Sequence, residues 1–257
     1  SMAASFIPIN EEGTPLHSAI GWADARPIPY MQEEMSHFLR GKRIKNCGQY
    51  PLPMYLPFTI DWFNASYPTV GKKVKKWLNV SEFIYNRLAG ITEHYTDFSI
   101  ASRTMLFDIE KKNWNSYALD YFNIDIDLLP IPIHSGTVIG NVGKEISELG
   151  FSSNTPIVMG GHDHMCAILG AGIDNPNVLL NSTGTSEAIV SLINKPFDIN
   201  QIVGSWLNCQ YTTQKNKLAV TAYVSASGRV YQSAGETLLP YNDIMPDEIM
   251  SLPIFFP

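Results

Sequence analysis

The chain has 257 residues with a net charge of -6, and 45% of the residues are hydrophobic whereas 16% are charged. Such a chain can bury a sizeable core, in one large domain or two smaller ones. The sequence has no basic stripe for nucleic acid and no apolar run that could cross a bilayer, and its three dispersed cysteines favour reduced thiols in a cytoplasmic protein.

The N-terminal part predicts a hairpin. Residues 5–10 and 14–20 have strand character on either side of a Glu-Glu-Gly turn. The second strand runs into Trp22, Asp24 and Arg26, which follow one another at a spacing of two. This concentration of polar groups just past a strand end marks a candidate site.

Helices are expected next. An apolar stripe at helical spacing predicts a helix over residues 31–40. Its core-facing positions would be Met31, Met35, Phe38 and Leu39. Three further helices are predicted, over residues 58–63, 70–78 and 80–90. In the last of these, Ser81 is a suitable cap and Gly90 a suitable stop.

The middle of the chain alternates short elements. A run of small and polar residues over 96–104, with strand or loop character, leads into the apolar residues 105–109. The sequence then predicts an amphipathic helix, a strand and a short helix, over residues 114–122, 137–142 and 144–149.

Residues 157–172 predict a strand, a tight turn and a helix start. A β-branched run ends at Gly160 and Gly161, and Asp163 follows where the helix begins. Because Asp is a favoured helix cap, a purely structural role is the favoured interpretation of Asp163 taken alone.

The pattern changes after residues 173–177, a turn-rich connector and candidate domain boundary. Strands are expected over residues 178–182, 187–193, 205–212 and 218–224, followed by a helix from residue 227. Antiparallel strands followed by a helix are how a ribonuclease H-like unit begins.

The loop between the first two of these strands consists of hydroxyl residues and one glycine: Thr183, Gly184, Thr185 and Ser186. A tight loop of this kind can aim backbone N–H groups and hydroxyls at phosphate oxygens. A plain polar hairpin turn is the alternative interpretation.

Three stretches in this order resemble the FGGY family of carbohydrate kinases, which includes xylulokinase, fuculokinase, gluconokinase and glycerol kinase. They are the Trp-x-Asp-x-Arg motif at 22–26, the segment 97–108, and residues 160–163 with the hydroxyl loop that follows. The resemblance runs from about residue 5 to the end of the chain.

The resemblance implies an α/β protein with the actin-like, ribonuclease H-like ATPase fold, in which two lobes enclose a cleft. Residues 1–174 would be a nearly complete N-terminal, sugar-binding lobe that lacks its first strands. Residues 175–257 would begin the C-terminal lobe, which binds ATP with Mg²⁺. A cytoplasmic enzyme of carbohydrate metabolism is implied, with no nucleic-acid or membrane partner.

The resemblance also implies roles for single residues. Asp163 would be the catalytic base, and the substrate contacts would be Trp22, Asp24, Arg26, Asp97 and His162. The nucleotide phosphates would meet Thr183, Gly184, Thr185, Ser186 and Gly228. No metal ligand is assigned within this chain.

The expected chemistry suits these residue types. A sugar hydroxyl becomes a better nucleophile when a carboxylate within hydrogen-bond reach takes its proton. Alignment and charge stabilisation supply most of the remaining acceleration in phosphoryl transfer. The start of a helix favours a carboxylate, so capping and catalysis are compatible roles for Asp163.

The chain departs from the family at both ends. The family's N-terminal Asp-x-Gly-Thr loop would lie before residue 1, and the adenine-binding segment would follow residue 257. We therefore expect that this polypeptide alone phosphorylates nothing, and that exposed sheet edges favour a homo-oligomer. The sugar itself is left open, although Phe98 stands where glycerol kinases carry a substrate-binding Tyr.

Two other functions stay open. One is a metal-dependent hydrolase that uses His162, Asp163 and His164, although we expect adjacent side chains to point in different directions. The other is a non-catalytic sugar-binding fragment or relic, which would keep the sugar contacts without binding nucleotide.

Overall fold

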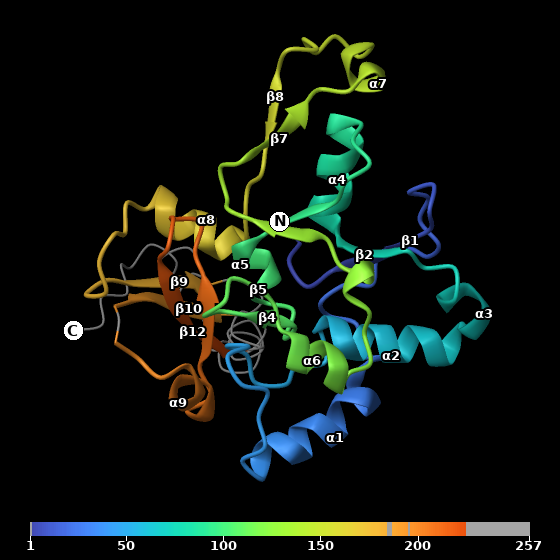
Figure 1. Cartoon of the computed structure of the whole chain (residues 1–257). Helices are drawn as coiled ribbons and strands as arrows, with labels where there is room; N and C mark the ends of the chain where they lie inside the picture. The colour runs from blue at the N-terminus through green and yellow to red at the C-terminus, as the bar shows by residue number, and fades with distance from the viewer. Residues whose placement is uncertain (1, 184–186, 195, 225–257) are drawn as a thin grey trace, which may run out of the picture.

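The computed structural model describes residues 2–183, 187–194 and 196–224 (Figure 1). The contacts expected of Gly184, Thr185, Ser186 and Gly228, and the helix expected from residue 227, lie outside the described residues. The first elements are β1 Phe6–Ile9, α1 Ile28–Leu39, α2 Leu56–Ser66, α3 Pro68–Gly71, β2 Lys76–Asn79, α4 Val80–Ala89, β3 Tyr95–Asp97, α5 Phe98–Ala101, β4 Phe107–Asp108, β5 Asn113–Trp114 and α6 Ser116–Tyr121. The later ones are η1 Ile126–Leu128, β6 Ile131–Ile133, β7 Val138–Asn141, α7 Lys144–Ser147, β8 Pro156–Val158, α8 Asp163–Gly170, β9 Leu179–Thr183, β10 Glu187–Ile193, α9 Ile199–Gly204, β11 Asn208–Tyr211 and β12 Leu218–Val224.

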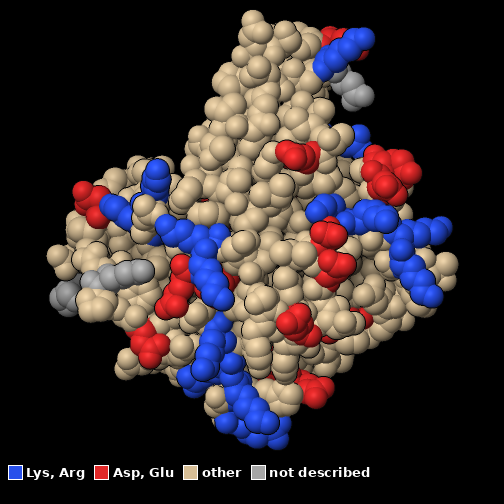
Figure 2. Space-filling model, in the orientation of Figure 1, with Lys and Arg blue, Asp and Glu red and all other residues tan. Residues whose placement is uncertain are grey.

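The largest sheet is antiparallel, with the strand order β11-β12-β10-β9, and α8 lies against it (Figure 1). The strands of the N-terminal part form short pairs: β1 with β2, β4 with β5, and the parallel pair β3 with β6. The β7–β8 hairpin projects from the body as an arm with α7 at its tip (Figure 1). In Figure 2 the arm is largely uncharged below its tip, whereas basic and acidic side chains are interspersed over the body.

The main core is built largely of aromatic side chains. Its fully buried members from the N-terminal part include Tyr55, Phe58, Phe63, Trp77 and Phe107. Side chains from α9, β11 and β12 complete the same core. Hydrophobic packing therefore joins the segments before and after the predicted boundary.

A second cluster fixes α8 to the large sheet. Met165 and Ile168 of α8 pack with Ala188, Val190 and Leu192 of β10. In its packing α8 thus belongs with strands beyond the connector at 173–177. The division into residues 1–174 and 175–257 stays a prediction.

The prediction of a helix over residues 70–78 is wrong. Helix α3 ends at Gly71, and Lys76–Asn79 form β2, which pairs antiparallel with β1 so that Phe6 lies opposite Asn79. The apolar residues Val74, Trp77 and Leu78 have helical spacing, but all three are buried around an extended chain. A partner strand distant in the sequence overrode the local pattern.

Other elements also differ from expectation. The second strand of the N-terminal hairpin is reduced to the isolated bridges Ile9–Pro15 and Phe6–Ile20, because Pro15 has no N–H to donate to a ladder. Leu39, expected in the core, is 66% exposed because it ends α1. Helix α9 was not predicted.

The helix predicted over residues 80–90 is confirmed, but its cap is Asn79 rather than Ser81. The Asn79 Oδ1 accepts the N–H of Ser81 at 3.2 Å, and the Asn79 N–H donates to Glu82 Oε2 at 2.6 Å. This reciprocal pair is a capping box. Gly90 ends the helix with a φ of 62°, as expected.

The capping box places the Glu82 carboxyl where water does not reach it. Burial raises the pKa of Glu82 from the ordinary value of 4.5 to about 7, although hydrogen bonds from Thr96 and Asn79 act in the opposite direction. Between these two values the folded protein binds more protons here than the unfolded chain does. This group therefore lowers the free energy of unfolding as pH rises through that range.

We expect Glu82→Gln to remove this pH dependence while preserving the cap, since glutamine also serves in capping boxes. Between about pH 5 and about pH 8 the variant should gain up to roughly 3 kcal/mol of stability relative to the wild type. Chemical unfolding at both pH values measures the difference, with the exposed Glu33→Gln on α1 as the control. Parallel pH profiles for the wild type and Glu82→Gln would contradict the assignment.

Candidate active site

The turn between β8 and α8 has no room for side chains at two positions. A Cβ on Gly160 would lie 2.8 Å from Tyr85 Oη, and one on Gly161 would lie 2.3 Å from Thr213 Cγ2 and 2.9 Å from Ser99 Oγ. Close approach, rather than a positive φ, therefore explains the glycine pair that the sequence analysis identified.

Asp163 is the first residue of α8, and the expectation that it caps this helix is wrong. The N-cap is His162, whose side chain makes no capping hydrogen bond. The Asp163 Oδ1 instead accepts the N–H of its neighbour His164 at 2.9 Å. The side chain of Asp163 is 52% exposed.

His162 supplies a neutral partner to this carboxylate. Its Nε2 lies 3.0 Å from Asp163 Oδ1, and its side chain is buried. Burial first, and then the charges of Arg103 and His164, hold the pKa of His162 well below its ordinary value. The carboxylate can only accept a hydrogen bond. The proton of the neutral ring is therefore on Nε2, which donates a hydrogen bond to Asp163.

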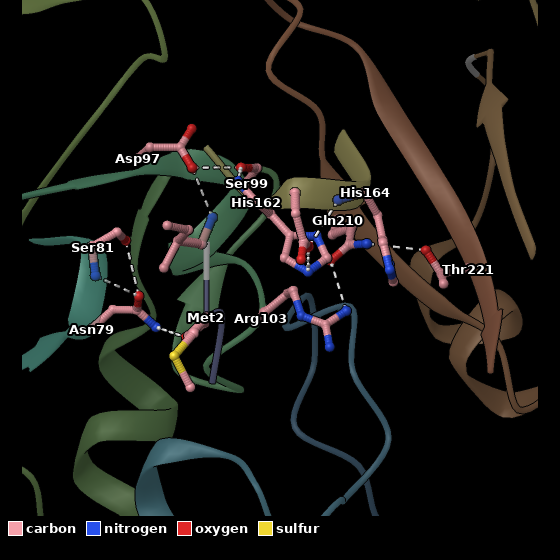
Figure 3. Close-up of polar contacts among 12 residues, drawn as sticks. Met2, Asn79, Ser81, Asp97, Ser99, Arg103, His162, His164, Gln210 and Thr221 are labelled. Carbon is pink, nitrogen blue, oxygen red and sulfur yellow. Dashed lines mark hydrogen bonds and ion pairs between the residues drawn. The ribbon is translucent and has the colours of Figure 1, made fainter. Parts of the chain in front are cut away.

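Asp97 lies next to this turn, and both oxygens of its carboxylate accept hydrogen bonds. It caps α5 by accepting the N–H of Ile100 at 2.9 Å, and it also accepts hydrogen bonds from the hydroxyls of Ser99 and Ser135. Ser99 Oγ in turn accepts the backbone N–H of His162 at 2.8 Å (Figure 3). Burial raises the pKa of Asp97, although these hydrogen bonds oppose the shift.

A cavity of about 190 Å³ opens beside the turn. It brings together Trp22, His162 and Asp163 from the residues identified in the sequence. The other lining residues are Met2, Ala3, Met54, Arg103, His164 and Tyr223. The cavity thus places one carboxylate, one guanidinium and two imidazoles around a single small space.

The structure does not bring Asp24 and Arg26 to this cavity. They pair with each other, with Arg26 Nε 2.9 Å from Asp24 Oδ1 and Nη2 2.5 Å from Oδ2. The guanidinium carbon also lies 4.0 Å from the centre of the Trp62 ring. Both polar groups of the motif are therefore engaged, and only Trp22 reaches the cavity.

Thr183 is the last residue of β9 and faces Glu187 of β10 across the start of the hydroxyl loop. It does not line the cavity at Asp163. Its expected contact with nucleotide phosphates stays a prediction.

Sequence reasoning missed Arg103 and His164 as parts of this site. Arg103 is the one basic residue in the run of small and polar residues over 96–104, which is a signal that could have identified it. His164 was visible in the sequence but was considered only as a metal ligand. Met2, Met54 and Tyr223 reach the cavity through tertiary contacts that leave no local pattern.

The expectation that His162, Asp163 and His164 diverge is wrong. One ligand atom from each residue lies within 4.8 Å of the others. Asp163 is the first residue of the helix and stands between the two histidines in the sequence. The two histidine rings are 5.0 Å apart between centroids and nearly perpendicular. This arrangement could hold a divalent ion of the kind that imidazole and carboxylate ligands bind.

Comparison with known proteins identifies relatives along most of the chain. The model of the N-terminal domain of the FGGY family of carbohydrate kinases matches residues 1–170. A xylulose kinase of Lactococcus lactis is 34% identical over 192 residues, which cover 72% of this chain and 36% of that protein. A gluconokinase of Bacillus subtilis is 28% identical over 194 residues, covering 75% of this chain and 37% of that protein.

The fold matches solved structures of such kinases. The crystal structure of gluconate kinase from Lactobacillus acidophilus superposes with a TM-score of 0.84 at 24% identity, and covers 97% of this chain and 50% of that one. The actin-like ATPase fold is therefore confirmed, and the chain spans about half the length of its solved neighbour. No helix in the described part of the chain is long and apolar enough to cross a bilayer.

We expect Ser99→Ala to destabilise the fold by roughly 2–3 kcal/mol, because it leaves the buried His162 N–H without a partner and removes one of the hydrogen bonds to the buried Asp97 carboxylate. Chemical unfolding measures the loss. The exposed Ser18→Ala is the matched control and should change stability by less than about 0.5 kcal/mol. Equal effects of the two substitutions would show that the Ser99 hydroxyl does not hold the turn.

Proposed function

Because this chain belongs to the FGGY family of carbohydrate kinases, we propose that it carries the sugar-binding part of an enzyme that transfers a phosphoryl group from ATP to a hydroxyl of a sugar or polyol. The observation that carries the proposal is the Asp163 carboxylate, held at a cavity wall by a neutral histidine. A half-exposed carboxylate in that position can reach a bound hydroxyl.

Asp163 acts as the general base in this proposal. It takes the proton of the sugar hydroxyl while the oxygen forms its bond to phosphorus, and the bond from phosphorus to the leaving nucleotide breaks. The His162 Nε2–H and the His164 N–H both donate to Asp163 Oδ1, and together they fix the orientation of the carboxylate at the cavity wall. Ser99 fixes the backbone of the turn, so the base is oriented before substrate arrives.

Substrate would be bound on the same cavity by Trp22 and His162. Asp24, Arg26 and Asp97 support the site indirectly, since the first two pair with each other and the third holds Ser99. ATP with Mg²⁺ would supply the phosphoryl group and neutralise its charge. Thr183 is the described residue proposed to meet the phosphates, at the entrance of the hydroxyl loop.

Location and assembly follow only as proposals. The three cysteines are free, which suits the reducing cytoplasm. The projecting arm exposes Val138, Leu149 and Phe151, which favours self-association into a homo-oligomer.

We expect Asp163→Asn to leave sugar affinity within about threefold, because an amide still accepts a hydrogen bond, and to lower turnover by roughly 10²–10⁴-fold. Calorimetry with a sugar panel tests binding, and sugar-dependent ADP release tests turnover in a form of the protein that is active. For the 257 residues alone we expect binding without ADP release, because the chain spans only about half of its solved neighbours. An Asp163→Asn variant that turns over normally would remove Asp163 from the role of base.

A non-catalytic sugar-binding protein is the alternative. It predicts sugar affinity with no affinity for ATP analogues. Calorimetry with both ligands therefore separates a sugar-binding relic from the working half of a kinase.

A metal-dependent hydrolase is the second alternative, because the ligand atoms of His162, Asp163 and His164 converge. The kinase proposal predicts that the purified chain holds less than about 0.1 equivalent of zinc, and that chelation leaves sugar affinity unchanged. Elemental analysis before and after chelation measures this. Stoichiometric metal that is lost in a His164→Ala variant would favour the hydrolase instead.

A further inference from the structure

The loop between β11 and β12 contacts α8 at both of its ends. Near the start of the helix, the Thr213 hydroxyl donates a hydrogen bond to the Met165 carbonyl oxygen at 3.0 Å. Just beyond the end of the helix, the side-chain amide of Gln214 donates to the Ile173 carbonyl oxygen at 2.8 Å. Two neighbouring residues of one loop therefore fix the position of the helix along its whole length.

Thr213 contacts the chain on either side of Asp163. Its hydroxyl reaches Met165, two residues after the carboxylate. Its methyl group lies against Gly161, two residues before the carboxylate, so closely that a Cβ at Gly161 would be 2.3 Å from Thr213 Cγ2. One side chain thus limits the movement of the backbone on both sides of the proposed base.

The loop is itself fixed to the part of the chain that follows α5. The Tyr211 N–H donates to Ser102 Oγ at 3.1 Å, and both residues are buried. Further along the loop, Lys112 Nζ donates to Asn216 Oδ1 at 2.6 Å. Because Ser99 of α5 accepts the N–H of His162, the contacts from Ser99 and Thr213 to the turn belong to one connected framework.

The position of a catalytic group matters more than its presence alone. A displacement of about 1 Å can lower a rate roughly 10²-fold, even when the substitution lies away from the chemistry. Thr213 does not line the cavity at Asp163. Any effect of its hydroxyl on the reaction therefore acts through the backbone that carries the carboxylate.

We propose that Thr213 is a positioning residue, whose hydroxyl holds the backbone of residues 161–165 so that the Asp163 carboxylate keeps its place at the cavity wall. This inference rests on the proposed kinase function and adds to it a residue of the C-terminal strands. The framework of the base then includes the β11–β12 loop as well as α5.

Thr213→Val keeps the shape of the side chain and removes its hydroxyl. In a form of the protein that is active, kcat should fall by roughly 10–100-fold, because the base is displaced. KM should stay within about threefold, because Thr213 does not line the cavity. Sugar-dependent ADP release measures both constants. Thr213→Ser keeps the hydroxyl and should have a kcat within about threefold of the wild type.

A second measurement uses the 257-residue chain and needs no activity. Hydrogen exchange followed by mass spectrometry should be about 3–10-fold faster over residues 162–168 in Thr213→Val, the effect of losing one hydrogen bond. Gln214→Ala should instead speed exchange over residues 169–174 and leave kcat within about threefold. The control is Thr14→Val, an exposed threonine of the N-terminal turn, which should change neither exchange nor kcat.

The outcomes separate this role from a structural one and from the kinase function. Faster exchange in Thr213→Val with an unchanged kcat would overturn the positioning role, as would a low kcat in Thr213→Ser. Thermal unfolding checks each variant, and Thr213→Ala replaces Thr213→Val if the latter does not fold. A wild type without sugar-dependent ADP release in any form would overturn the kinase function and the positioning role with it, whereas the exchange rates would still decide whether Thr213 holds the turn.

Discussion

The hydroxyl of Ser99 holds together two parts of the chain that lie 63 residues apart. It accepts the backbone N–H of His162 and donates to the buried carboxylate of Asp97. Loss of the first bond would leave the buried His162 N–H unsatisfied, which costs more than the bond itself contributes. Gly161 lies so close to both Thr213 and Ser99 that a side chain at this position would clash with each of them. The position of the turn that carries Asp163 is therefore set by tertiary packing.

The cavity at this turn combines groups that would be unstable together in another arrangement. The imidazoles of His162 and His164 are kept neutral by burial and by the nearby cation. Arg103 lines the same cavity, and the Asp163 side chain is 52% exposed. A carboxylate and a guanidinium therefore share one small space with two neutral imidazoles.

Much of this fold could be predicted from the sequence. The strand, glycine pair and helix around Asp163 were legible because they are local, and so was the antiparallel pattern of β9, β10 and β12. The resemblance of separated motifs supplied the fold, which the solved neighbours confirm, whereas the role of Asp163 as base stays a proposal. Strand β2 could not be predicted, because it exists through pairing with β1 and its apolar spacing imitates a helix. The site was predicted less completely: Asp24 and Arg26 pair with each other, and the inclusion of Arg103 depends on how α5 packs against β11.

Helix α8 is attached to different parts of the molecule at its two ends. Its apolar face is buried on the large sheet through Met165 and Ile168, whereas its first residues are tied to α5 through Ser99. Eight residues of helix span about 12 Å and bend little over that length. A displacement of the sheet would be transmitted along this rigid rod to Asp163, so the orientation of its carboxylate is mechanically coupled to the position of the C-terminal strands. The helix would then act as a lever between the large sheet and the cavity wall.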